Sequence, residues 1–143
     1  MTFVDANIVL RFLTKQPPEQ AAWARDILER GQQGALKLVL EPLTVAEVIY
    51  VLTGVYGYPL ERVKGELLAL LTTGAVRLEY ERAVLDALSR MSQKLDFPDT
   101  YLAARARLAS GEVVSFDRGF KQLEVGWLEP GSDDARQGAE ADE

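Results

Sequence analysis

Short apolar runs alternate with longer segments of helical periodicity along the chain, and this alternation restricts the possible folds more than any other feature of the sequence. The runs that predict strands are residues 2–4, 37–40, 75–78, 112–116 and 125–128. The segments that predict helices are residues 6–13, 18–31, 42–56, 60–74, 80–93 and 98–109. The apolar stripe of the segment 18–31 consists of Ala22, Trp23, Ile27 and Leu28. Such alternation is typical of an α/β fold, in which helices flank a mostly parallel central sheet.

Length and composition predict one globular domain followed by an acidic tail. A chain of 143 residues that is 48% apolar can build one ordinary hydrophobic core, and we expect this domain to span residues 1–130. Residues 131–143 hold five acids, one arginine and no apolar side chain larger than alanine. Burial cannot offset the ordering entropy of such a segment, so we expect a disordered tail. Because no stretch resembles an export signal or a membrane span, we expect a cytoplasmic protein.

The absence of histidine and cysteine narrows the available chemistry. Without cysteine there are no disulfides, zinc-thiolate sites or thiol nucleophiles. Without histidine the usual general base near neutral pH is missing, together with the commonest nitrogen ligand of transition metals. Carboxylates remain in quantity, and their oxygens suit hard cations such as Mg²⁺ and Mn²⁺.

The formal net charge of −6 does not exclude a nucleic-acid substrate. The tail, residues 131–143, contributes −4 of it, which leaves −2 for residues 1–130. Candidate phosphate contacts in that part of the chain are Arg11, Lys15, Arg105, Arg107, Arg118 and Lys121. Each of them can equally be ordinary solvated charge.

Two aspartates follow predicted strands at equivalent positions. Asp5 comes directly after the first strand, and Asp117 comes directly after the fourth. In open parallel sheets, ligands bind in the crevice beyond the carboxyl ends of the strands, so both side chains should point into it. The alternative is that each aspartate caps the helix that follows.

A third aspartate, Asp99, lies in the first turn of the helix opened by Pro98. It shares a stripe with Leu102, Ala103 and Ala106 that should face inward, where an acid costs free energy unless it is paired or bound to a cation. The alternative is a favourable interaction with the helix dipole. Asp96 is the better candidate for capping this helix.

Glu47 lies at the edge of an apolar helical stripe that contains Val45 and Val48. Spacing alone also allows a solvated glutamate. Thr44, one turn earlier, can orient the carboxylate or a water molecule, or it can cap the helix.

Four separated segments, taken in order, resemble the PIN-domain nuclease family and, within it, the VapC-type toxins of bacterial toxin–antitoxin pairs. They are FVDANI (3–8), LTVAEV (43–48), FPDTYLAA (97–104) and SFDRGF (115–120). The resemblance covers nearly all of residues 1–128. It departs from the family pattern at Ala6 and Ser115, where the family often has threonine, and at Pro98 and Tyr101, where smaller residues are commoner.

The resemblance implies a PIN-like three-layer fold and a ribonuclease activity that depends on Mg²⁺ or Mn²⁺. It implies that Asp5, Glu47, Asp99 and Asp117 hold the metal. Asn7 and Ser115 would be supporting polar residues, and Thr44 joins them by its position beside Glu47. Four converging carboxylates repel one another, so without metal some of them should have raised pKa values.

The resemblance also implies partners: an RNA substrate, a cognate antitoxin that blocks the crevice, and a second copy of the chain in a homodimer. The apolar segment 48–71, with Tyr50, Tyr56 and Tyr58, is a candidate surface for the antitoxin or the second copy. It can equally be core.

Two other functional classes stay open. An aspartate-nucleophile phosphatase also places an aspartate after its first strand, but it would have a second acid two residues later, where this chain has Asn7. A non-catalytic α/β binding or scaffolding domain would use the acids only as caps and surface charge.

Overall fold

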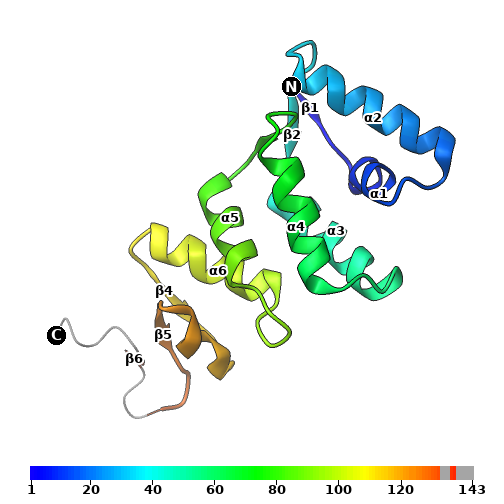
Figure 1. Ribbon diagram of the computed structural model, residues 1–143. Coiled ribbons are helices and arrows are strands. Elements are labelled where there is room, and N and C mark those ends of the chain that lie inside the picture. The colour runs from blue at the N-terminus through cyan, green and yellow to red at the C-terminus, as the bar shows by residue number, and fades with distance from the viewer. Residues whose placement is uncertain (133–135, 138–143) are drawn as a thin grey trace. The chain divides into compact units, whose positions relative to one another are not determined.

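The computed structural model describes residues 1–132 and 136–137, which belong to two compact units, Met1–Glu81 and Arg82–Glu143 (Figure 1). The boundary between the units falls inside the expected domain 1–130, whose extent stays a prediction. Most of the expected tail, residues 133–135 and 138–143, lies outside the described residues. The remaining part includes a short strand, described below.

The N-terminal unit contains a three-stranded parallel sheet in the order β1-β2-β3. Its strands are β1 (Thr2–Phe3), β2 (Leu38–Leu40) and β3 (Arg77–Leu78). Thr2 is paired with Leu38, and Leu40 is paired with Leu78. All three residues of the central strand β2 are buried, as its uninterrupted apolar run predicts.

Helices occupy the segments where periodicity predicts them. The N-terminal unit has α1 (Ala6–Thr14), α2 (Pro18–Gln32), α3 (Pro42–Tyr50), the π-helix η1 (Val51–Val55) and α4 (Leu60–Leu71). Proline opens α2 and α3, at a position whose N–H has no partner within a helix. The predicted helix 42–56 therefore exists, but its last turn widens into η1.

The buried face of α2 differs from the predicted one. Periodicity placed Trp23 on the inward stripe, whereas its side chain is 61% exposed. The buried residues of α2 are Ala21, Ala24 and Leu28. Small side chains allow α2 to approach α1 closely, and a tryptophan at such a contact would hold the two helices apart.

Within the C-terminal unit, β4 (Glu112–Val114) pairs in parallel with β5 (Gly126–Leu128), which pairs antiparallel with β6 (Arg136–Gln137). Its helices are α5 (Glu81–Arg90, which begins at the unit boundary), α6 (Phe97–Leu108) and the 3₁₀-helix η2 (Arg118–Leu123). One buried cluster holds α6, the sheet and η2 together: Ala103, Val113, Phe120, Leu123, Val125 and Trp127. This cluster fixes the segments that carry the C-terminal acids.

Two details of this unit correct the sequence predictions. Leu102 was expected on the inward stripe of α6, but its side chain is 49% exposed, and the buried face is formed by Phe97, Thr100, Ala103 and Ala104. The strand expected at 112–116 ends at Val114. It ends there because the Ser115 hydroxyl accepts a hydrogen bond from the Asp117 N–H (2.9 Å), which turns the chain.

The candidate surface at 48–71 is partly core. Val48, Val63 and Leu67 are fully buried, whereas Tyr50 is 73% exposed. None of the helices that the structure describes combines the length and the apolar character needed to cross a membrane. Parallel strands alternating with helices give the chain the α/β organisation that its sequence predicts.

Candidate functional site

Asp5 lies two residues after β1 and is exposed. It is the N-cap of α1, and its Oδ2 accepts a hydrogen bond from the Asn7 N–H at 3.4 Å. The capping interaction proposed from the sequence is therefore present. It uses one carboxylate oxygen over a long distance, so the carboxylate keeps the capacity to bind another group.

Glu47 lies on α3, and its side chain is exposed. Thr44, one turn earlier on the same helix, is half-buried. The exposure of Glu47 agrees with a solvated glutamate and equally allows it to reach a ligand. Asp5 and Glu47 both belong to the N-terminal unit.

The C-terminal unit holds three aspartates at the starts of helices. Asp96 caps α6, and its Oδ1 accepts a hydrogen bond from the Asp99 N–H at 3.1 Å. Asp117 caps η2, and its Oδ1 accepts from the Gly119 N–H at 2.8 Å. The Ser115 hydroxyl, which turns the chain after β4, thereby orients the Asp117 backbone. Asp99 itself is half-buried in the first turn of α6.

The electrostatic environment of Asp99 shows that these aspartates interact. Burial is the main cause that raises the pKa of the Asp99 carboxyl above its ordinary value, and the negative charges of Asp96 and Asp117 raise it further. A carboxylate held in this way carries a cost that a bound cation would relieve. Asp96 is thus part of this environment as well as a helix cap.

The chemistry of these side chains fits a divalent cation. All the donors are carboxylate oxygens, which suit Mg²⁺ and Mn²⁺, and the repulsion at Asp99 is what such an ion neutralises. Within either unit, however, no three acidic side chains among the described residues form a ready-made group of metal ligands. The convergence of Asp5, Glu47, Asp99 and Asp117 on one ion stays a prediction.

A comparison with known families connects this arrangement to a function. A protein-family model described as the PIN domain matches residues 2–126. The chain belongs to the PIN-domain family. The match confirms the α/β PIN-like fold class, and PIN domains are generally metal-dependent nucleases. No curated protein sequence matched the chain.

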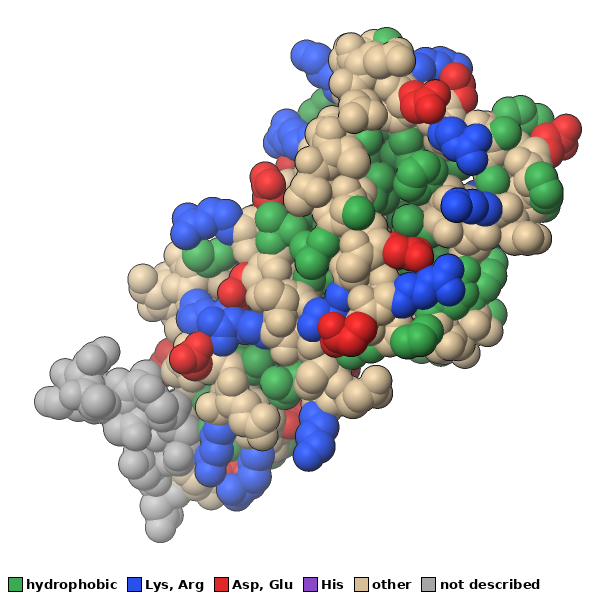
Figure 2. Space-filling view, viewed as in Figure 1, with side chains coloured by type: hydrophobic (Ala, Val, Ile, Leu, Met, Phe, Trp, Pro, Cys, Tyr) green, Lys and Arg blue, Asp and Glu red, His purple; other side chains and the backbone are tan. Residues whose placement is uncertain are grey.

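The basic residues of this PIN domain differ in how their side chains are used. Arg107 was a candidate phosphate contact, but its guanidinium donates hydrogen bonds to Asp86 and to the carbonyl of Leu123. Its side chain is therefore occupied by interactions within the C-terminal unit. On the visible face of the N-terminal unit, basic and acidic side chains are interspersed (Figure 2).

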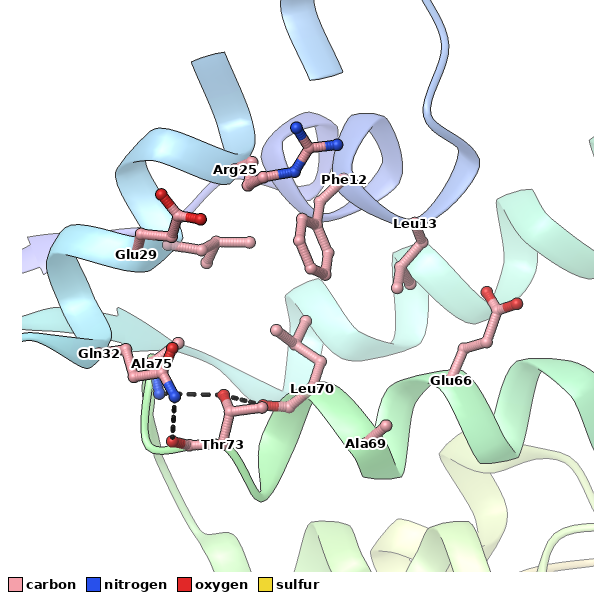
Figure 3. Close-up of a pocket in the computed structure, with 11 residues that line it drawn as sticks. Phe12, Leu13, Arg25, Glu29, Gln32, Glu66, Ala69, Leu70, Thr73 and Ala75 are labelled. Carbon is pink, nitrogen blue, oxygen red and sulfur yellow. Dashed lines mark hydrogen bonds between the residues drawn. The ribbon is translucent and has the colours of Figure 1, made fainter. Parts of the chain in front are cut away.

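A pocket in the N-terminal unit is lined mainly by apolar side chains from α1, α2 and α4 (Figure 3). Its volume is 390 Å³. None of the four predicted acids lines it, so it is separate from the candidate acidic site. Glu66 lines it from α4, and the Oε1 atom of Glu66 is buried without a hydrogen-bond partner among the described residues. No local sequence pattern predicts this pocket, because its lining residues come from three separate helices and from the segment between α4 and β3.

The direction of the pKa shift at Asp99 predicts how the stability of the metal-free protein changes with pH. Because folding raises this pKa above its ordinary value of 3.8, the folded state binds more protons than the unfolded state between the two values. The resulting loss of folding stability is absent below the ordinary pKa, and it grows as pH rises through the raised pKa of the folded state. Asp99→Asn removes the titration. The stability of the wild type relative to this variant should therefore rise as pH falls from about 7 to about 4.

Denaturant unfolding of both proteins at several pH values, with a chelator present, measures this difference. The control is Asp26→Asn, which removes an exposed carboxylate from α2 in the other unit. The stability of the wild type relative to Asp26→Asn should not rise in the same way as pH falls. Parallel stability curves for wild type and Asp99→Asn would contradict the prediction.

Proposed function

We propose that this PIN-domain protein is an endoribonuclease that hydrolyses RNA phosphodiester bonds with Mg²⁺ or Mn²⁺. Asp5, Glu47, Asp99 and Asp117 would hold the metal. The observation that carries the proposal is the environment of Asp99, a half-buried carboxylate whose pKa is raised by burial and by the charges of Asp96 and Asp117. Keeping this carboxylate charged costs free energy, and a cation bound there would relieve that cost.

The chain's own residues would prepare the site in specific ways. The Asp96 carboxylate holds the Asp99 N–H and so fixes the first turn of α6. The Ser115 hydroxyl accepts a hydrogen bond from the Asp117 N–H, and the Gly119 N–H donates one to the Asp117 carboxylate. Asn7 and Thr44 would support Asp5 and Glu47 in the N-terminal unit.

A bound divalent cation supplies charge neutralisation at the phosphodiester and makes water a better nucleophile near neutral pH. One of the four carboxylates would accept the proton of the attacking water. No covalent intermediate with the chain is needed. The absence of histidine is consistent with this division of roles, because no imidazole base is required.

The proposal extends to the toxin of a toxin–antitoxin pair, acting as a homodimer and inhibited by a cognate antitoxin. The resemblance of the four acidic segments to VapC-type toxins supports this role. Exposed apolar side chains on α3 and η1, including Tyr50 and Val55, and the apolar pocket beside Glu66 support contacts with other polypeptides. Induced expression should then arrest the growth of a bacterial host, and Asp117→Asn should abolish the arrest. Equal growth of both strains at equal protein levels would oppose the toxin role.

A scaffolding function is the second candidate, because one observation favours it: Asp5, Asp96 and Asp117 each cap a helix. Capping alone would explain why these positions are acidic. An aspartate-nucleophile phosphatase is less well supported, since the position two residues after Asp5 is Asn7.

The experiment that separates these functions is an RNA cleavage assay with a pool of fluorescent single-stranded RNAs. The nuclease proposal predicts fragments that appear with Mn²⁺ or Mg²⁺ and disappear when the ion is chelated. A DNA pool of the same sequences tests whether cleavage depends on the ribose. Intact RNA at millimolar metal, together with no measurable metal binding, would favour the scaffolding function.

A further inference from the structure

A pair of arginines connects α5, α6 and the end of η2 within the C-terminal unit. The Arg107 guanidinium, on α6, donates through Nη2 to Asp86 Oδ2 on α5 and through Nη1 to the carbonyl oxygen of Leu123. Its side chain is only 23% exposed. Leu123 is the last residue of η2 and belongs to the buried cluster.

The second arginine, Arg90, contacts Glu124, the residue that follows Leu123. Arg90 Nε donates to Asp86 Oδ1 at 3.2 Å, and Arg90 Nη1 donates to Glu124 Oε1 at 2.7 Å. Both oxygens of Asp86 are thus used by arginines. Arg107 also contacts Leu123, the last residue of η2, and Arg90 also contacts Glu124, its C-cap. Glu124 has a left-handed backbone (φ 54°), a conformation that a residue with a Cβ adopts only at a cost.

The opposite end of η2 is Asp117, whose Oδ1 accepts from the Gly119 N–H. The chain before Asp117 is held by the Trp127 Nε1–H, which donates to the carbonyl of Ser115 at 2.8 Å. The segment 115–124 is therefore attached to the rest of the unit on both sides of η2. Because η2 is a single short helix between these two attachments, we expect a shift of its end at Leu123 to displace its start at Asp117.

A partly buried arginine–aspartate pair is weak evidence for stability, because the desolvation of both charges offsets much of their attraction. Such a pair can instead specify the position of the segment that it contacts. Here Arg107 contacts the end of η2 at the backbone carbonyl of Leu123. A backbone carbonyl cannot rotate away from its partner as a side chain can. A lysine in place of Arg107 has a single ammonium group and cannot reproduce the two fixed donor positions by which the guanidinium reaches Asp86 and Leu123.

We propose that Arg107, braced by Asp86, is a positioning residue for Asp117: it fixes the end of η2 and so holds the Asp117 carboxylate where it binds metal. The effect on metal rests on the proposed function, whereas the effect on the position of Asp117 does not. Arg107 does not touch the reacting atoms in this account.

The test uses Arg107→Gln and Arg107→Lys in the full chain, with Arg82→Gln as the matched control. Arg82 is an exposed arginine of α5, so its replacement removes the same charge from the same unit. The first measurement is the amide hydrogen exchange of Gly119 by NMR without metal, because this N–H bonds directly to Asp117 Oδ1. The second is Mn²⁺ affinity by calorimetry.

The proposal predicts that Arg107→Gln speeds Gly119 exchange by about tenfold and weakens Mn²⁺ binding by about 10- to 100-fold, as expected for a group that orients a ligand. Arg107→Lys should restore neither in full. The core amides of Val113 and Trp127 should exchange as in the wild type, and Arg82→Gln should change nothing. A role in stability alone would speed the core amides as much as Gly119.

Unchanged Gly119 exchange in Arg107→Gln, or exchange that rises only in step with the core amides, overturns the proposal. A different result is also decisive: Arg107→Gln speeds exchange at Gly119 but not at the core amides, and the wild type binds no Mn²⁺. It supports the positioning of Asp117 by Arg107 and contradicts the proposed function. The two proposals therefore fail by different results.

Discussion

Replacement of Asp117 by asparagine is expected to reduce the rate of RNA cleavage by about 100-fold or more while the fold stays intact. Loss of a residue that only orients a metal ligand typically costs about 10- to 100-fold, so loss of a ligand should cost at least as much. The asparagine oxygen can still accept the hydrogen bond from the Gly119 N–H, and asparagine caps helices as well as aspartate does. The substitution therefore removes charge and leaves the local structure.

The comparison is made in the same cleavage assay at saturating Mn²⁺, with circular dichroism to confirm the fold. Asp26→Asn is the matched control, because Asp26 is an exposed aspartate whose partner is Arg30 on the same helix. Cleavage by Asp117→Asn within about twofold of the control would show that Asp117 is a cap and nothing more.

Gly31→Ala is expected to lower the free energy of unfolding by about 2–3 kcal/mol, the upper part of the range for overpacked sites. A Cβ at this position would lie 2.3 Å from the carbonyl oxygen of Ala75 and 2.7 Å from Leu38 Cδ1. The leucine can change its rotamer, but the backbone oxygen cannot move without displacing the chain that leads into β3. Helix α2 must therefore shift away from the sheet of its own unit.

Gly65→Ala is the matched control, because Gly65 is also within a helix, α4. Apart from its chain neighbours and the backbone of α4, no heavy atom of the described residues would lie within 4 Å of an added Cβ. Alanine has the higher helix propensity, so this variant should gain up to about 1 kcal/mol. Denaturant unfolding of both variants gives the comparison. A neutral or stabilising Gly31→Ala would show that α2 does not approach the sheet as closely as described.

Local sequence patterns predicted most elements of secondary structure, but not η2 or β6. Apolar runs marked the strands, and proline marked the starts of α2 and α3. The end of α2 was predicted at Gly31, a common stop signal, but the helix continues to Gln32. There the glycine is required by packing against Ala75 and not by the backbone conformation of a helix end.

Long-range packing explains the errors. Trp23 and Leu102 fit helical stripes by spacing, yet both are exposed, because small residues on the neighbouring faces make the close contacts. The contacts of Arg107 join residues that are 21 and 16 positions away along the chain. No periodicity encodes such pairs, so Arg107 had the same sequence signal as a solvated basic residue.

The candidate site was likewise predicted only in part. Asp99 was expected to carry an electrostatic cost because of its place on α6, and its raised pKa agrees with that expectation. The sequence ranked Asp96 only as a cap, whereas its charge also acts on Asp99. Convergence of acids from the two units depends on tertiary structure and stays a prediction.

A calorimetric Mn²⁺ titration tests the central claim most directly, because it asks whether acids from both units hold one ion without requiring a known substrate. The proteins compared are the wild type, Asp5→Asn, Asp117→Asn and the control Asp26→Asn. The proposed metal site predicts saturable binding in the wild type and in Asp26→Asn, and affinity weakened by about tenfold or more in Asp5→Asn and Asp117→Asn. No saturable binding in the wild type at millimolar Mn²⁺, or wild-type affinity in Asp5→Asn, would contradict it.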